Sequence, residues 1–109
     1  MSRVSNVIIA VPVGEDTAAR LWEVNAYFER RKERGFPGDI QELAPDAIGG
    51  HKALESALFI GAFNYLDLLD FLRHLAGAVR WDAPDAVQVL VRTEEEELWD
   101  LFRLPEQGA

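Results

Sequence analysis

Two apolar runs predict β-strands that lack a polar face. Residues 4–13 form a β-branched run that ends at Pro12 and Gly14, and residues 54–63 alternate one apolar set with another. Since successive side chains of a strand point to opposite faces of the sheet, a strand of this kind is apolar on both sides. We therefore predict that both strands lie in the interior of a sheet.

Apolar residues at helical spacing predict two helices. The first extends from residue 16 or 17 to residue 34, with Leu21, Val24 and Phe28 on its apolar stripe and basic residues near its end. The second begins at Asn64, where Asp67 three residues later completes the pattern of a helix N-terminus, and continues to about residue 80 with a leucine-rich stripe. His74 lies beside that stripe, and we interpret it as a structural residue.

The C-terminal part of the chain has the pattern of a β-hairpin. Val87, Val89 and Val91 alternate with other side chains, a run of glutamates follows, and a second alternating run covers residues 97–104. Pro105 ends this run. The pattern predicts two antiparallel strands joined by an acidic turn.

The order of these elements is β-α-β-α-β-β, with a long irregular segment at residues 35–53. Four strands and two helices in one domain of residues 1–109 predict an α+β, two-layer sandwich with a four-stranded mixed sheet. Within the irregular segment, Asp39 and Glu42 could cap one short helical turn. Loops of this length in compact domains are usually functional or mobile, so this segment is the first place to look for a binding surface.

The predicted sandwich has one unsolved difficulty. Two helices can cover one face of the sheet, yet the interior strands are apolar on both faces. Large apolar patches are seldom left exposed, so the second face needs a cover. That cover is the 35–53 loop, a second copy of the chain or another protein, unless the helices straddle the sheet. This difficulty is the strongest argument in the sequence for an interaction role.

Composition narrows the function classes. The chain has 109 residues, a net charge of −8 and no cysteine, which excludes disulfides, cysteine-ligated metals and thiol nucleophiles. Residues 1–50 carry a charge of −2 and residues 51–109 a charge of −6. A field of this sign repels nucleic-acid backbones and attracts basic partners. No apolar run reaches the length of a membrane span and no secretory signal is visible, so we expect a cytoplasmic protein.

The sequence contains few candidate catalytic residues. His51, Lys52 and Glu55 lie in or beside the long loop and could form a ligand site or supply a general base. The Gly-Gly-His-Lys sequence around them matches no phosphate-binding spacing, so a simple turn into the next strand is the favoured interpretation. No nucleophile motif and no metal-ligand spacing is present. We therefore predict a protein that is not an enzyme and has no cofactor and no metal.

Acidic residues of the second half form a candidate patch. The run at residues 94–97 protects a strand edge from pairing, or it forms part of a surface that imitates phosphates and blocks a basic site on another protein. The members of this candidate patch are Asp82, Asp85, Glu94, Glu95, Glu96, Glu97 and Asp100.

Several aromatic residues lie near the ends of predicted elements or on the terminal hairpin, where full burial is difficult. Tryptophan, tyrosine and arginine are also the residue types that most often anchor protein interfaces. The candidate interface residues are Trp99, Phe102, Arg103, Trp81 and Tyr65.

Three segments carry a resemblance to other proteins. The sequences GGHKALE at residues 49–55, FNYLD at 63–67 and WDAPDAVQ at 81–88 resemble a pattern in small acidic proteins of high-GC actinobacteria and their bacteriophages. The resemblance covers roughly residues 49–104 and brings no catalytic residue with it. Those proteins have no assigned activity. Together with the two-sided apolar strands and the aromatic hairpin, the resemblance favours a phage or prophage accessory protein that binds and modulates a bacterial host protein.

The leading hypothesis is therefore a non-enzymatic protein-interaction module that forms a homodimer or binds another protein, and contacts neither nucleic acid nor membrane. The alternatives are a small enzyme or ligand-binding protein that uses the loop around His51, and an acidic phosphate mimic.

Overall fold

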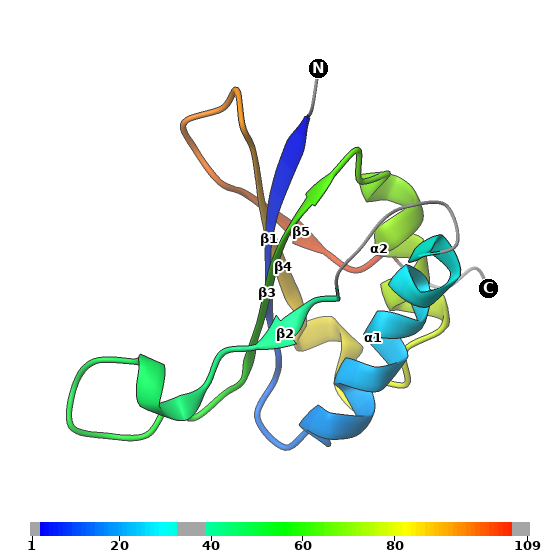
Figure 1. The fold of residues 1–109 in the computed structure, drawn as a ribbon. Coiled ribbons are helices and arrows are strands. Elements are labelled where there is room, and N and C mark those ends of the chain that lie inside the picture. The colour runs from blue at the N-terminus through cyan, green and yellow to red at the C-terminus, as the bar shows by residue number, and fades with distance from the viewer. Residues whose placement is uncertain (1–2, 33–38, 106–109) are drawn as a thin grey trace.

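A computed structural model describes residues 3–32 and 39–105. The described residues form an α+β structure in two layers, with the helices α1 and α2 on one face of a twisted sheet (Figure 1). The α+β class and the two helices are as predicted. The sheet has the order β2-β3-β1-β4-β5, and every neighbouring pair in it is antiparallel. Its strands are β1 (Val4–Ala10), β2 (Gln41–Glu42), β3 (Leu58–Asn64), β4 (Gln88–Thr93) and β5 (Asp100–Arg103).

The prediction of a four-stranded mixed sheet was wrong in two respects. The described residues contain a fifth strand, β2, which lies inside the predicted irregular segment, and the sheet is antiparallel throughout. A strand of two residues is too short to produce an alternating pattern, so the sequence gives no sign of it. This short strand also explains the direction of β3. Helix α1 brings the chain back so that β2 runs in the direction of β1, and the β2–β3 hairpin then reverses it.

The helices begin at capping aspartates. Helix α1 spans Thr17–Lys32, and the Asp16 side chain accepts a hydrogen bond from the Ala19 N–H at 3.2 Å. Helix α2 spans Leu68–Gly77, and the Asp67 side chain accepts from the Asp70 N–H at 3.2 Å. The predicted start of the second helix at Asn64 was three residues too early, because the capping residue is Asp67. The predicted end of the first helix, at residues 33–34, lies outside the described residues.

Two short 3-10 helices complete the described elements: η1 (Pro45–Ala47) and η2 (Pro84–Ala86). No helix in the described part of the chain is both long and apolar enough to cross a membrane.

The core lies between the sheet and the helices. Alternate residues of the central strand β1 point into it, and Val7 and Ile9, together with Val11 just after the strand, are all at most 1% exposed. Aromatic rings fill the space between the helices, with the rings of Tyr27 and Phe71 5.1 Å apart in an edge-to-face arrangement. These contacts fix the helix layer on one face of the sheet, so the other face is left to solvent.

Glycine at position 61 of β3 is required by a ring of the same strand. A Cβ atom at Gly61 would lie 2.7 Å from the Phe63 ring, which is stacked on Phe28 at a centroid distance of 4.3 Å. Phe63 cannot shift without loosening this stack. We expect Gly61→Ala to lower the free energy of unfolding by about 1 kcal/mol in urea titrations. Gly49→Ala, where an added Cβ atom would meet nothing within 4 Å, is the control, and an equal or smaller loss for Gly61→Ala would contradict the explanation.

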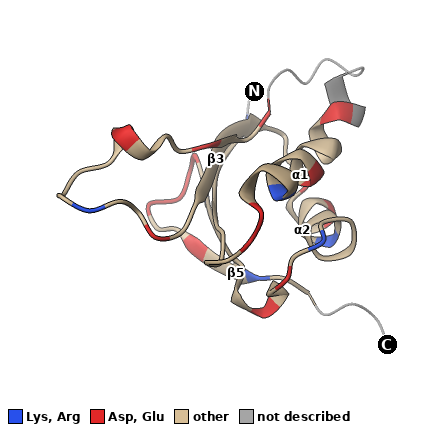
Figure 2. Ribbon diagram, turned by 90° about the horizontal axis from the view of Figure 1, so that it is seen from below, with Lys and Arg blue, Asp and Glu red and all other residues tan. Residues whose placement is uncertain are grey.

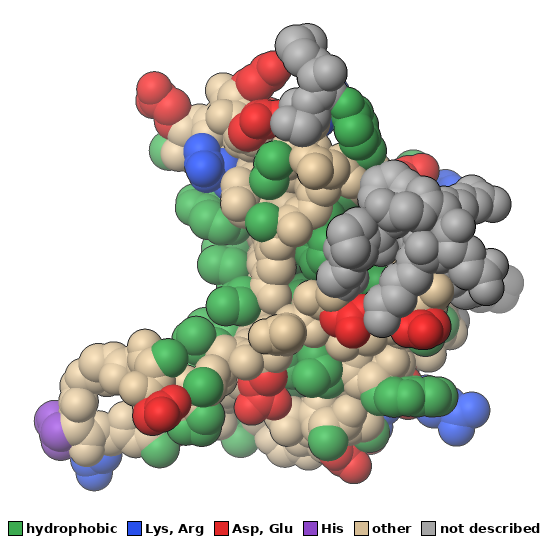
Figure 3. Space-filling view, viewed as in Figure 1, with side chains coloured by type: hydrophobic (Ala, Val, Ile, Leu, Met, Phe, Trp, Pro, Cys, Tyr) green, Lys and Arg blue, Asp and Glu red, His purple; other side chains and the backbone are tan. Residues whose placement is uncertain are grey.

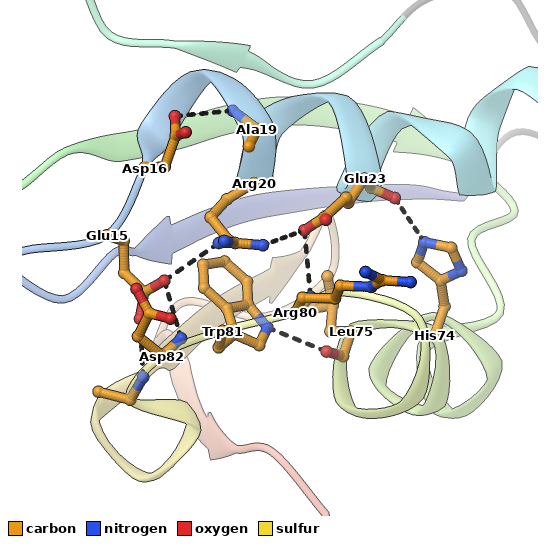
Figure 4. A network of polar contacts seen from close by, with 11 residues as sticks. Glu15, Asp16, Ala19, Arg20, Glu23, His74, Leu75, Arg80, Trp81 and Asp82 are labelled. Carbon is orange, nitrogen blue, oxygen red and sulfur yellow. Dashed lines mark hydrogen bonds and ion pairs between the residues drawn. The ribbon is translucent and has the colours of Figure 1, made fainter.

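A polar network ties the loop before β4 to helix α1 (Figure 4). The Glu15 carboxylate, with 1% of its side chain exposed, accepts hydrogen bonds from the Asp82 and Ala83 N–H groups at 3.0 and 2.8 Å. It also pairs with Arg20 at 3.1 Å, and Arg20 pairs with Glu23 at 2.5 Å. Burial by itself lowers the pKa of Arg20, but the hydrogen bonds and charges of Glu23 and Glu15 together raise it above its usual value.

His74 has the structural role that the sequence indicates. Its Nε2 atom lies 2.9 Å from the carbonyl oxygen of Glu23. Because a carbonyl oxygen only accepts hydrogen bonds, Nε2 carries the proton and donates it. His74 thereby joins helix α2 to helix α1.

Candidate interaction surface

The sheet face opposite the helices, here called the open face, carries a row of apolar side chains. The row crosses four strands, because Ile60 of β3 pairs with Ile8 of β1, Ile8 with Leu90 of β4, and Leu90 with Leu101 of β5. Directly paired residues of antiparallel strands share a face. Ile60 is 36% and Leu101 55% exposed, and the central pair is partly exposed. An uncovered apolar row of this kind is unusual on a strictly monomeric protein.

Acidic side chains are absent from the open face of the four strands that carry the row. The register places these further residues beside the row: Val4, Asn6, Ala10, Leu58, Ala62, Asn64, Gln88, Arg92 and Arg103. Their charged members are both arginines, although the whole chain has a net charge of −8. The open face of these four strands therefore carries no acidic side chain.

An open groove of about 680 Å³ runs along one side of the open face. Ile8 and Ile60 contribute to its lining, together with Leu43, Ala44 and Trp99, and the acidic residues Asp39 and Glu42 line it beside β2. Figure 3 shows hydrophobic side chains gathered along this hollowed side of the molecule. The groove is wide and shallow, which is a shape that suits a protein segment better than a small substrate.

Residues 43–57, here called the arm, join β2 to β3 and project away from the sheet on the side opposite the helices (Figures 1 and 2). The arm includes most of the predicted 35–53 loop, whose residues 35–38 lie outside the described part of the chain. This corrects the idea that the loop folds under the sheet. His51, Lys52 and Glu55 are all exposed on the arm, and none of them lines the groove. The structure does not bring these three side chains together around a cavity.

The base of the arm is fixed to helix α1 by one asparagine. The Asn25 side chain donates to the Ile40 carbonyl at 3.0 Å and accepts from the Ile40 N–H at 2.9 Å. Ile40 itself is 0% exposed and immediately precedes β2. Sequence analysis missed this contact, since a polar residue within a helical pattern does not indicate its partner 15 positions away.

The residues of the candidate acidic patch fall into two groups. Residues 94–97, here called the acidic turn, connect β4 to β5 and lie next to Asp100 at the start of β5. Asp82 and Asp85 lie before the opposite end of β4, and the six residues of that strand separate the ends by about 20 Å. The acidic side chains are thus distributed around the molecule (Figure 2).

One acidic-turn residue has a structural role. Glu94 Oε1 accepts a hydrogen bond from the Val4 N–H at 3.0 Å, and the Glu94 N–H donates to the Val4 carbonyl at 3.0 Å. Glu95, Glu96 and Glu97 are exposed. These three carboxylates are the solvent-exposed charges of the turn.

Three predicted interface residues lie on the terminal hairpin. Trp99 is 43% exposed and lines the groove. Arg103 is exposed on the open face, where its guanidinium donates to the Asp85 carbonyl. Phe102 pairs with Val89 on the helix face of the sheet, and it is half-buried against the core. Two of these three residues are therefore available on the open face.

The other two predicted interface residues lie elsewhere. Trp81 is 8% exposed and belongs to the core, where its indole Nε1 donates to the Leu75 carbonyl at 2.9 Å. Its place between two elements suggested a surface position, but the side chain packs into the core beside helix α2. Tyr65 is 59% exposed in the turn between β3 and α2, with a φ of 55°.

The described residues place no group of three or more His, Asp or Glu side chains where it could hold a metal ion. No protein-family model, no curated protein and no solved structure matches the chain.

Proposed function

We propose that this protein is a non-enzymatic interaction module that binds a protein partner through the open face of its sheet. The observation that carries the proposal is the uncovered row of Ile60, Ile8, Leu90 and Leu101 beside a wide groove. Trp99, which also lines this groove, adds an aromatic anchor of the kind that dominates interface energetics.

The geometry favours this function over a small enzyme. An active site needs polar groups that converge on a bound substrate within hydrogen-bond reach. His51, Lys52 and Glu55 are exposed on the projecting arm, away from the groove lining. Hydrophobic residues make up much of the groove, which suits the apolar side chains of a protein.

The geometry also favours it over phosphate mimicry. A mimic needs carboxylates at regular spacing on one surface, whereas the candidate acids divide between the two ends of β4. The resemblance to actinobacterial and phage proteins is compatible with an accessory protein that acts by binding.

Two exposed tryptophans on different elements provide a matched test. Trp99 lines the groove, whereas Trp22 is 75% exposed on helix α1. An immobilised chain is incubated with a high-GC bacterial lysate to which an untagged copy of the chain has been added. We expect Trp99→Ala with Leu101→Lys to reduce the retained protein at least tenfold, because an apolar side chain loses about 1.5–3 kcal/mol when its burial is prevented.

The control variant Trp22→Ala should retain the same proteins as the unaltered chain. Binding of an apolar dye, which reports exposed apolar surface, should fall in the open-face variant and stay constant in the control. Equal retention by both variants, with equal dye binding, would contradict the proposed function.

A further inference from the structure

We infer that the occupant of the open face is a second copy of this chain, placed so that the arm of each copy lies against the acidic turn of the other. This inference rests on the proposed function and specifies its partner. Three observations carry it: the positions of the arm and the turn, their charges, and the size of the face.

The arm and the acidic turn lie at diagonally opposite corners of the open face. The arm joins β2 to β3 at one side of the sheet, and the turn joins β4 to β5 at the other side. They also lie at opposite strand ends, since the arm leaves β3 at Leu58, which pairs with Ala10, whereas the turn follows Thr93, which pairs with Ser5. Both segments lie on the side of the sheet that faces away from the helices (Figures 1 and 2).

The tip of the arm and the acidic turn carry opposite charge. Lys52 is the basic residue at the tip, next to His51, while the turn presents Glu95, Glu96 and Glu97. The arm as a whole has a net charge of −1, because Asp46 and Glu55 lie on either side of the tip. Lys52 is thus the charge that the tip offers to the turn of a neighbouring copy.

Symmetry then selects one arrangement. Two identical faces that pack on each other are related by a two-fold axis that lies between them. If the axis follows the diagonal through the arm and the turn, each turn meets the other turn, and like charges oppose each other. If it follows the other diagonal, each arm tip meets the partner's turn, and the like charges near the axis are the two Arg103 side chains, each of which donates to the Asp85 carbonyl of its own chain. The strands of the two sheets then cross at a steep angle, which is one of the two common modes of sheet packing.

The size of the face explains why the arms are needed. The five strands contain 26 residues in all, and strands about 4.8 Å apart with a rise of about 3.3 Å per residue then give a flat footprint of about 400 Å² per copy. A stable interface buries about 800 Å² per partner, so the flat face alone falls short. An arm of 15 residues that reaches along the partner supplies the missing area, with Ile48 and the 44% exposed Leu54 as its apolar contacts.

A cysteine-pairing experiment tests the arrangement directly, because the natural chain contains no cysteine. Purified Lys52→Cys and Glu96→Cys chains are oxidised separately and as a mixture. We expect the mixture to form the mixed disulfide at least ten times faster than either chain forms its own dimer. Preferential self-dimers of each variant would instead identify the like-on-like axis and overturn the proposal.

A charge-reversal experiment tests the energetic basis by sedimentation equilibrium. Lys52→Glu and the double variant Glu95→Lys, Glu96→Lys should each raise the dimer dissociation constant at least tenfold, whereas their equimolar mixture should regain the original affinity. In the mixed dimer both arm–turn contacts join opposite charges, so this recovery is specific to the arrangement. Arg73→Glu, an exposed reversal on α2, is the control and should leave the constant unchanged.

The failure of this inference and of the proposed function can be told apart. A chain that stays monomeric at every concentration tested overturns the second-copy inference. If the Trp99→Ala, Leu101→Lys variant nevertheless retains fewer proteins from the lysate and binds less dye, the proposed function stands with a different partner. If neither readout responds to that variant, both proposals are wrong.

Discussion

Replacement of Glu15 by alanine is expected to lower the free energy of unfolding by about 3 kcal/mol. The carboxylate accepts two backbone hydrogen bonds, from Asp82 and Ala83, and pairs with Arg20, all while 1% of its side chain is exposed. Hydrogen bonds to charged groups contribute about 1.5–3 kcal/mol each, and the loss of this acceptor leaves partly buried donors without a partner. The loop before β4 would lose its attachment to helix α1.

Urea unfolding followed by far-ultraviolet circular dichroism measures this loss. Glu97→Ala, which removes an exposed carboxylate of the acidic turn, is the matched control and should change stability by less than about 0.5 kcal/mol. Glu15→Gln keeps one acceptor oxygen and should lie between the alanine variant and the natural chain. A Glu15→Ala chain as stable as the control would show that the network contributes nothing.

The strands with strong alternation were predictable from sequence. Val87, Val89 and Val91 repeat every second position, and all three are at most 3% exposed in the structure. Seven residues of the β-branched run became the central strand β1, flanked on both sides as its two apolar faces required. Such strands can be predicted because the alternation itself decides which residues are buried, whatever the order of the strands in the sheet.

The sequence predicted that an apolar interaction surface exists, but not where it lies. Two apolar sheet faces and two helices implied an uncovered face, and the structure contains one. The sequence could not show whether the long loop covers the sheet. The path of the loop depends on the Asn25–Ile40 contact and on the two residues of β2. Trp81 shows the same limit, since its burial depends on a hydrogen bond to the carbonyl of Leu75 on another element.

Asn25 connects this folding detail to the proposed interface. Replacement of Asn25 by alanine is expected to lower the free energy of unfolding by about 2 kcal/mol, because it leaves the N–H and the carbonyl of the fully buried Ile40 without their partners. The effect should be concentrated at the base of the arm, since β2 pairs with β3 through two residues and has little else to hold it.

Hydrogen exchange separates this local effect from a general loss of stability. In Asn25→Ala, amide exchange should accelerate most at residues 40–43 and at their β3 partners, and less in the central pair of β1 and β4. Asn64→Ala, at the exposed end of β3, is the control and should leave the pattern unchanged. Uniform acceleration across the sheet would contradict the assigned role. A looser arm base would also weaken self-association, because ordering the arm would then cost more on binding.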